Sequence, residues 1–321
     1  MSALGAGDGN AVTARVGSSP DVPGITVVVP THDRHDRLIE CLDALVAQTY
    51  PSEKTQVIVV DDGSPSPARP VLDRFVKSHG FEIVEQENLG PAAARNAGAA
   101  LATHGWVAFT DDDCRPDPMW LARLAAAARE HPTAMLGGPI RNALSDNLCA
   151  EASQQLVSYL YEYFADADGA GRFLTSNNLA VPVDGFRELG GFSEAFPLAA
   201  AEDRDFCHRW ARSGRSIVYV PGARVDHGHA LRLSSYWRQH VGYGRGAHRY
   251  HSRRAQRGEG NLRVEPVRFY TGMLRYPFRT GVRKPAAVST LIALAQVANA
   301  LGYFAEAARS RRSSGGERRP A

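Results

Sequence analysis

The sequence predicts an α/β protein built on a mostly parallel β-sheet with helices on both faces and a helical extension at the C-terminal end. Three observations favour this class. Short β-branched runs alternate with segments whose apolar residues recur at helical spacing, which is the alternation that produces parallel sheets. The 321 residues suffice for one large domain with an appendage or for two domains. The composition, 44% hydrophobic and 22% charged, is that of a globular chain and excludes disordered, collagen-like and disulfide-scaffold proteins.

The expected elements alternate along the N-terminal third of the chain. Short apolar or β-branched runs predict strands at residues 24–30, 56–60, 81–85 and 106–110. Apolar spacing and a run of small residues predict helices at residues 37–49, 70–79 and 92–102. Polar clusters end three of the strands, at residues 31–34, 61–64 and 111–113. Because ligands of such sheets bind beside the carboxyl ends of the strands, we expect one binding site at this edge.

Several classes are excluded by what the sequence lacks. It has no G-x-x-x-x-G-K-[ST] string, and its glycine-rich segment at residues 242–246 follows no strand, which argues against P-loop NTPases and dinucleotide dehydrogenases. Residues 1–22 lack the apolar core of a signal peptide and are expected to form a flexible leader. The four cysteines form no C-x-x-C pair and indicate reduced thiols in a cytosolic compartment.

Charge is distributed unevenly along the chain. Residues 1–231 carry 19 basic and 30 acidic side chains, whereas residues 232–321 carry 18 basic and four acidic ones. This asymmetry suggests a metal-and-substrate site in the acidic part and a basic segment that meets an anionic partner.

Asp111, Asp112 and Asp113 follow the fourth expected strand. Adjacent carboxylates repel one another unless a cation neutralises them, although aspartate is also common in solvated turns. Their hard oxygens suit Mg²⁺ or Mn²⁺. Asp62, at the end of the second strand, could likewise belong only to a turn, or it could accept a hydrogen bond from a nucleotide base or ribose.

Seven motifs occur in a fixed order. The chain reads VVVPTHDR at 27–34, VVDDGS at 59–64, ENLGPAAARNAG at 87–98, FTDDDCRPDPMWL at 109–121, TSNNLAV at 175–181, LGGFSEAF at 189–196 and AEDRDFCHRW at 201–210. This succession closely resembles the family 2 inverting glycosyltransferases, which have the GT-A fold. The resemblance covers residues 24–230 and continues more loosely to residue 250. Each motif is modest alone, but the ordered set is highly specific.

The resemblance implies a nucleotide site at the strand ends. Pro30, Thr31 and Asp33 would contact the nucleotide base, and Asp62 would hydrogen-bond to it. Arg95 is similar to the family arginine beside the nucleotide.

The aspartate triplet matches the D-x-D motif of the family. Asp111 would lie near the ribose or the metal, and Asp113 would bind the Mn²⁺ or Mg²⁺ that bridges the diphosphate. Asp112 occupies the variable position within this nucleotide-binding loop. His227 or His229 would complete the metal shell, since the family often has a histidine here; a polar surface loop is the alternative.

Glu202 and Asp203 match the family's Glu-Asp motif, whose aspartate is the expected catalytic base. An acceptor hydroxyl must lose its proton as it attacks the anomeric carbon, so a carboxylate is needed within hydrogen-bond reach. Alone, the same pair would be read as acids that stabilise the first turn of a helix. Asn177 and Asn178 lie in the segment that usually faces donor sugar and acceptor, although asparagine is also a common turn residue.

The basic C-terminal part contains two unusual segments. Residues 236–257 mix arginine, histidine and aromatic residues, and we expect them to meet the donor diphosphate, a lipid-phosphate acceptor or an anionic membrane; a solvated helix is an alternative, and nucleic-acid binding is disfavoured for want of a known module. Residues 285–308 predict an amphipathic helix, with a polar stripe, that lies on a membrane or docks on protein rather than spanning a bilayer. Residues 310–321 are expected to be a disordered tail.

We therefore expect a glycosyltransferase domain at residues 23–230 and a basic helical extension at residues 231–309. The enzyme would move single sugars from a nucleoside-diphosphate sugar to a hydroxyl of a glycan, a lipid-linked acceptor or a small molecule, in the cytoplasm or at the inner face of the cell membrane. Processive members of the resembled family carry a Gln-x-x-Arg-Trp motif and several clear membrane helices. This sequence shows neither feature, so repeated polymerisation is disfavoured. The alternatives are a sugar-nucleotide nucleotidyltransferase and an inactive sugar-nucleotide-binding module.

Overall fold

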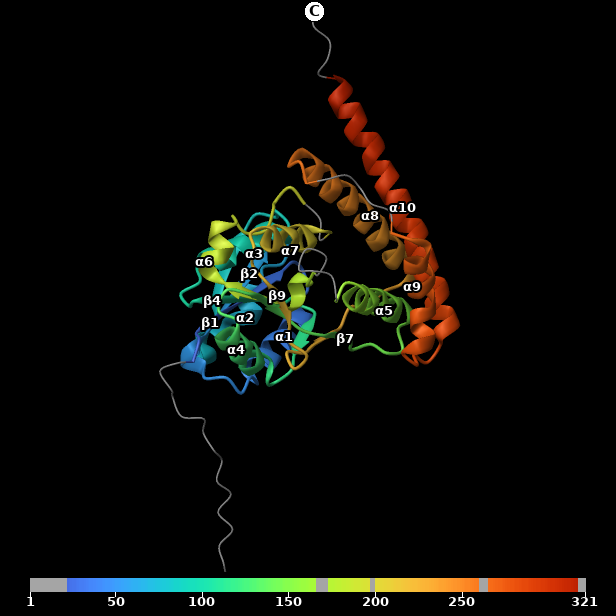
Figure 1. The fold of residues 1–321 in the computed structure, drawn as a ribbon. Coiled ribbons are helices and arrows are strands. Elements are labelled where there is room, and N and C mark those ends of the chain that lie inside the picture. The colour runs from blue at the N-terminus through green and yellow to red at the C-terminus, as the bar shows by residue number, and fades with distance from the viewer. Residues whose placement is uncertain (1–21, 166–172, 197–199, 260–264, 317–321) are drawn as a thin grey trace, which may run out of the picture.

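A computed structural model describes residues 22–165, 173–196, 200–259 and 265–316 (Figure 1). The expected leader, except Val22, and the last five residues of the expected tail lie outside the described residues.

The large sheet has seven strands in the order β3-β2-β1-β4-β8-β6-β9. Its strands are β1 (Ile25–Thr31), β2 (Thr55–Asp62), β3 (Glu82–Gln86), β4 (Trp106–Phe109), β6 (Met135–Gly137), β8 (Leu179–Pro182) and β9 (Ile217–Tyr219). All neighbours are parallel except β8, which runs antiparallel to β4 and β6. The predicted α/β class with a mostly parallel sheet is confirmed.

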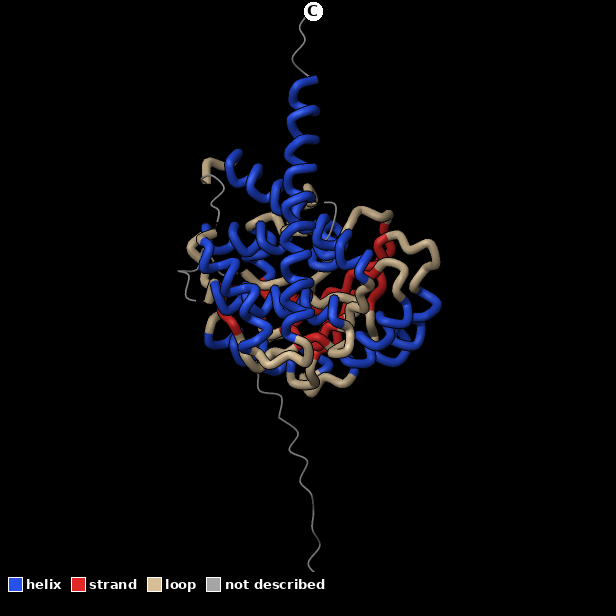
Figure 2. The backbone as a smooth tube through the Cα atoms, turned by 90° about the vertical axis from the view of Figure 1, so that its right-hand side faces the viewer, coloured by secondary structure: helices blue, strands red, loops and turns tan. Residues whose placement is uncertain are grey.

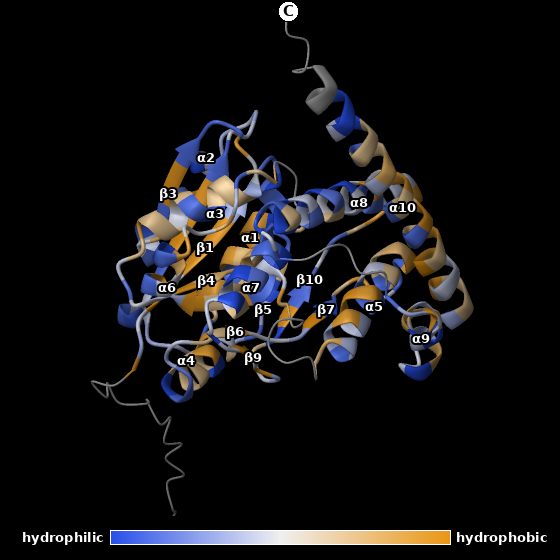
Figure 3. Ribbon diagram, turned by 45° about the horizontal axis from the view of Figure 1, so that its top comes forward, coloured by the Kyte–Doolittle hydropathy of each residue, from blue (hydrophilic) through white to orange (hydrophobic). Residues whose placement is uncertain are grey.

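Helices cover both faces of this sheet. One face carries α1 (His35–Val46), α2 (Arg69–His79) and α4 (Trp120–Glu130), and the other carries α3 (Pro91–Ala100), α6 (Val183–Glu188) and α7 (Glu202–Arg212). Because side chains alternate along a strand, Val27 and Val29 enter the first core and Val28 enters the second. Strands β1 and β4 of this sheet are accordingly drawn in the hydrophobic colour in Figure 3.

A second, three-stranded sheet lies beside the ends of the large sheet. It has the order β5-β10-β7, formed by β5 (Cys114–Pro116), β10 (Val225–His227) and β7 (Ile140–Asn142). Two short 3₁₀ helices, η1 (Ser52–Lys54) and η2 (Ser176–Asn178), complete this half of the molecule. The register places His227 opposite Cys114, the residue after Asp113.

Four helices form the other half: α5 (Leu148–Tyr163), α8 (Leu233–Gln256), α9 (Val267–Arg279) and α10 (Pro285–Gly316). They share one apolar core, to which α5 contributes although it lies well before the expected extension in the chain. Figure 1 shows α5 beside the sheets, and Figures 1 and 2 both show the C-terminal end of α10 projecting from the molecule.

Glycines let α8 and α10 pack backbone to backbone. A Cβ atom at Gly244 would lie 1.9 Å from the carbonyl oxygen of Asn299, and one at Gly302 would lie 2.0 Å from that of Val241. The glycine-rich segment is therefore a helix-packing feature and not a phosphate loop.

The polar stripe of α10 faces the protein. Ser289 Oγ donates to the Leu274 carbonyl oxygen (2.8 Å), and Arg249 Nε donates to Glu306 Oε1 (2.8 Å). The outer face is apolar instead, with Val297 53%, Leu301 54% and Phe304 69% exposed. Among the described helices, α10 alone is long and apolar enough to cross a membrane by length and composition, a criterion that core helices also meet.

The helix is also longer than expected. It continues to Gly316, so residues 310–316, predicted as part of a disordered tail, are helical. The physical reason is that neither proline nor glycine interrupts residues 303–314, so the backbone hydrogen-bond ladder can continue.

Candidate active site

The strand ends, the small sheet and the start of α7 surround one cavity of about 760 Å³. Asp111, Asp113, Glu202 and Asp203 all line it, together with both candidate histidines. The predicted metal-binding residues Asp111 and Asp113 and the predicted base, which are far apart in the chain, thus meet at a single site.

Asp113 is held by two histidines and two arginines. Its Oδ1 lies 3.1 Å from His227 Nε2, and its Oδ2 lies 2.9 Å from His229 Nδ1. Arg34 Nη1 and Arg37 Nη1 lie 3.2 Å and 3.5 Å from the same Oδ2. The pairing of β10 with β5 brings the histidines here, and Gly228 N donates to the Asp113 carbonyl oxygen (2.7 Å).

This environment keeps Asp113 ionised. Burial by itself would raise its pKa, but hydrogen bonds from His227 and His229 and the charge of Arg34 outweigh burial and lower the pKa. Burial opposes the charged form of His227, yet its bond to Asp113 raises the pKa of the imidazole.

The donor atoms fit a divalent cation of the Mn²⁺ or Mg²⁺ type. Asp113 and His227 present ligand atoms within 4.8 Å of each other, and His229 approaches the same carboxylate. A carboxylate with imidazoles suits a borderline-hard ion. Cys114 is equally near, but burial holds the pKa of its thiol above the ordinary value, and a sulfur ligand suits a softer ion than Mn²⁺ or Mg²⁺.

Arg95, on α3, links the triplet to α7. Its Nη2 donates to Asp111 Oδ1 (2.7 Å) and its Nη1 donates to Glu202 Oε1 (3.1 Å). Burial opposes its charge, but Asp111 and Glu202 raise the pKa of the guanidinium above its usual value. Arg95 therefore remains a buried cation, 3% exposed, that fixes both acids.

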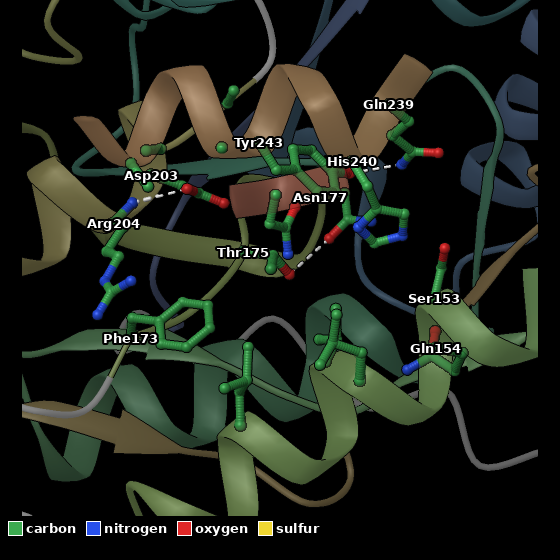
Figure 4. Close-up of a pocket in the computed structure, with 18 of the residues that line it drawn as sticks. Ser153, Gln154, Phe173, Thr175, Asn177, Asp203, Arg204, Gln239, His240 and Tyr243 are labelled. Carbon is green, nitrogen blue, oxygen red and sulfur yellow. Dashed lines mark hydrogen bonds between the residues drawn. The ribbon is translucent and has the colours of Figure 1, made fainter. Parts of the chain in front are cut away.

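Glu202 and Asp203 form the first turn of α7, and the backbone before them is strained. Ala201 has φ 72°, a left-handed conformation that is costly for a residue with a side chain. Asp203 Oδ1 accepts a hydrogen bond from Arg204 N (2.7 Å), as the helix-stabilising interpretation requires, yet the side chain still lines the cavity (Figure 4).

Both acids are harder to ionise than usual. Burial, followed by the charge of Asp203, raises the pKa of Glu202 to about 7, against the effect of Arg95. Burial also raises the pKa of Asp203. Glu202 Oε2 has no hydrogen-bond partner and is buried.

Asp112 is not among the residues that line the cavity. It accepts a hydrogen bond from Thr31 Oγ1 (2.8 Å) and lies 3.2 Å from Arg34 Nη1. Burial raises its pKa to about 6, although Arg34 opposes this. Thr31 and Asp112, both predicted to contact nucleotide, thus bond to each other, which secures the triplet to β1.

The other predicted base-contacting residues, Pro30, Asp33 and Asp62, are not among the residues that line the cavity. Asp62 accepts hydrogen bonds from Gln86, Leu89 N and Gly90 N (2.8–2.9 Å), so it organises the loop before α3 and retains one free lone pair. Asp33, with φ 54°, donates its N–H to Ser64 Oγ (2.8 Å), and Pro30 belongs to β1.

The two predicted asparagines, Asn177 and Asn178, differ in where their side chains lie. Asn177 lines the cavity and accepts a hydrogen bond from Thr175 Oγ1 (2.8 Å). Asn178 is fully buried: its Oδ1 accepts from Trp120 Nε1 (2.9 Å), and its Nδ2 donates to the carbonyl oxygens of Pro139 and Ala223. The amide of Asn178 thus joins η2 to the two sheets, and of the two asparagines predicted to face sugar only Asn177 lines the cavity.

Sequence reasoning missed two groups. Arg34 ends one of the polar clusters and Arg37 begins an expected helix, but nothing local shows that they reach Asp113, which lies far along the chain. Side chains of α5 and α8, among them Ser153, Gln239 and His240, form the far wall of the cavity (Figure 4). The aromatic and basic pattern of residues 236–257 was the available signal, but α5 carried none.

The fold and the acidic cavity are those of a GT-A glycosyltransferase, and comparison with known proteins agrees. The family model "Glycosyl transferase family 2" matches residues 26–184. The family model "Glycosyl transferase family group 2" matches residues 106–304, and this second match covers more than half of the chain. The chain belongs to the family 2 glycosyltransferases.

Curated relatives share part of this chain. Glycosyltransferase AglE of Haloferax volcanii is 26% identical over 62% of this chain and 65% of its own length. The pre-mycofactocin glycosyltransferase of Mycobacterium tuberculosis is 29% identical over 74% of this chain and 49% of its own. The matched region thus spans less than two thirds of either relative.

Solved structures share the GT-A fold. A mannosyltransferase from Pyrobaculum calidifontis, in complex with GDP-Man and Mn²⁺, has a TM-score of 0.56 at 20% identity and covers 92% of this chain and 80% of its own. The structure of TarS residues 1–349 from S. aureus has a TM-score of 0.51 at 16% identity, and the match covers 90% of this chain and 92% of the TarS chain.

Proposed function

We propose that this glycosyltransferase moves one sugar from a nucleoside-diphosphate sugar to an acceptor hydroxyl, with inversion and with the help of a divalent cation. The observation that carries the proposal is the meeting of Asp111 and Asp113 with Asp203 in one cavity. A donor diphosphate requires the first pair, and an attacking hydroxyl requires the third residue.

Asp203 is assigned the role of base. As the acceptor oxygen bonds to the anomeric carbon, the bond from that carbon to the diphosphate oxygen breaks, and the hydroxyl proton passes to Asp203. Glu202 is tied to Arg95 and supports this carboxylate instead of attacking the sugar. A single displacement by the acceptor inverts the anomeric centre.

Asp113, His227, His229 and Asp111 are assigned to the cation and the donor diphosphate. A bound Mn²⁺ or Mg²⁺ would neutralise charge that develops on the leaving diphosphate. Arg95, the strand-end residues Pro30 and Asp62, and Asp33 in the loop after β1 would surround the nucleotide, and Asn177 would face the sugar.

The outer face of α10 supports peripheral binding to the inner face of the cell membrane. Exposed Val297, Leu301 and Phe304 form an apolar stripe at helical spacing. Basic residues at both ends of the helix would favour anionic lipid.

A thermal-shift panel of UDP-, GDP- and dTDP-sugars, with and without Mn²⁺, tests the donor and the metal. A donor at a hundredfold excess over its Kd should stabilise the protein by about 2.7 kcal/mol. NMR of the anomeric proton in the product tests inversion. Absence of a shift with every donor, or a product with retained configuration, would contradict the proposal.

A further inference from the structure

The cavity continues beyond the acidic site into a space between α5 and α8 that α9 and α10 close. Its wall there is apolar, formed by Leu156, Val157 and Leu160 of α5 with Phe269 and Met273 of α9. This wall is poorly suited to a nucleotide or a bare glycan, whose hydroxyls would lose water without finding partners.

Unpartnered polar groups lie between the acidic and apolar parts. His240 is 1% exposed, and neither ring nitrogen makes a well-aligned hydrogen bond, although the side chain of Asn299 lies close enough to raise the pKa of the ring. Ser153 Oγ and Gln239 Oε1 are also buried without partners (Figure 4). Ser153 lies on α5 and faces Gln239 and His240 of α8 across the cavity (Figure 4). Buried polar atoms are normally satisfied, so three unsatisfied groups around one cavity indicate a ligand that completes their bonds.

His240 can both donate and accept. Burial lowers its pKa to about 4, with Asn299 opposing, so the ring is neutral at pH 7. A neutral imidazole, a hydroxyl and an amide oxygen match the hydroxyl groups of a sugar or similar head group.

The apolar part opens beside aromatic side chains. Tyr270 and Phe304 line the cavity and are 38% and 69% exposed. Phe304 also continues the exposed stripe of Leu301 and Val297 on α10. An apolar chain can therefore leave the cavity without entering water abruptly.

We propose that the acceptor is an amphiphile whose hydroxyl-bearing head group lies among Ser153, Gln239 and His240, beside Asp203, and whose apolar chain lies between α5 and α9. The inference rests on the proposed function, because it assigns the acceptor of the same transfer.

Alkyl maltosides, used below their micelle-forming concentrations, are suitable probes. Calorimetric titration of the full chain should show that octyl, decyl and dodecyl maltoside bind and that maltose binds far more weakly. Each added pair of methylenes should tighten Kd by about tenfold, since a buried methylene contributes about 0.8 kcal/mol. Equal affinity for maltose and dodecyl maltoside, or no binding of either, would overturn the proposal.

Substitutions inside and outside the cavity test where the alkyl chain of the maltoside binds. Val157→Asn and Met273→Gln should weaken dodecyl maltoside binding at least tenfold and reduce its dependence on chain length. Leu301→Gln, on the exposed stripe outside the cavity, should leave monomeric maltoside binding unchanged but weaken binding to anionic vesicles. A loss in Leu301→Gln with no loss in Val157→Asn would place the amphiphile on the surface and refute the cavity site.

The same samples separate this inference from the proposed function. Donor-dependent thermal stabilisation should persist in all three variants, which also shows that they are folded. Stabilisation by donor without maltoside binding would refute the amphiphilic acceptor alone, whereas absence of any donor effect in the unaltered protein would refute the transfer reaction itself.

Discussion

Replacing Glu202 by glutamine should stabilise the protein progressively more as the pH rises from 5 to 8. Glu202 is 3% exposed, Arg95 contacts one of its oxygens, and the other oxygen has no partner. Burial raises its folded-state pKa to about 7 from a reference value of 4.5. Glutamine keeps the shape and the acceptor for Arg95 but cannot ionise.

The sign follows from proton binding. Between about 4.5 and 7, folded Glu202 keeps a proton that the unfolded chain has released, so the free energy of unfolding of the wild type falls as pH rises. The favourable contribution of Glu202 to the free energy of unfolding is fully present below its pKa in the unfolded chain. It is lost as the pH rises through its pKa in the folded protein. At 1.36 kcal/mol per pH unit, this interval amounts to about 3 kcal/mol.

Urea unfolding followed by tryptophan fluorescence, in EDTA, measures the effect. The difference in unfolding free energy between Glu202→Gln and wild type should grow by about 2–3 kcal/mol between pH 5 and pH 8, because part of the effect is already complete at pH 5. Comparing pH values cancels any constant packing cost of the amide. Glu53→Gln, at an exposed turn, is the control and should change stability by less than about 0.5 kcal/mol. A difference for Glu202→Gln that does not vary with pH would refute the reasoning.

Three further perturbations test the site and the helix packing. Asp203→Asn should lower turnover by at least about 10²-fold while donor-dependent thermal stabilisation persists, and near-normal turnover in this variant would exclude Asp203 as the base. Turnover of the wild type should rise with pH, because burial raises the pKa of Asp203 and the base must lose its proton to act. Asp113→Asn should abolish the extra stabilisation that Mn²⁺ adds to donor binding, and an unchanged Mn²⁺ effect in the thermal-shift assay would contradict its role. Gly244→Ala should lower the unfolding free energy by about 1–3 kcal/mol, because the new Cβ would lie 1.9 Å from the Asn299 carbonyl oxygen. Gly242→Ala is the control and should be neutral or stabilising, because its Cβ would meet no atom outside its own helix within 4 Å. Equal effects of the two substitutions in urea unfolding would argue against close α8–α10 packing.

The strands in the N-terminal third of the chain could be predicted because their signals are local. A run such as residues 26–29 is β-branched and buried on both faces, which few structures other than a central strand allow. Strands β5, β7 and β10 are too short, at three residues each, to show a period. Helix α5 was missed because its apolar face meets helices that come much later in the chain.

The candidate site was predictable only in part. The aspartate triplet and the Glu202–Asp203 pair stand out as motifs, but the partners of Asp113 depend on the pairing of β5 with β10. Asn177 and Asn178 are equivalent in sequence, yet adjacent residues of a 3₁₀ turn point in different directions, so only one faces the cavity.

The sequence by itself determined the class of sheet, the order of the motifs and the family, because these depend on residues that are near one another in the chain. The tertiary structure alone decided which acids share a cavity, which residues hold Asp113, and that the polar stripe of α10 faces inward. Contacts between residues that are distant in the chain arise from how the sheets and helices pack, and no local pattern encodes that packing.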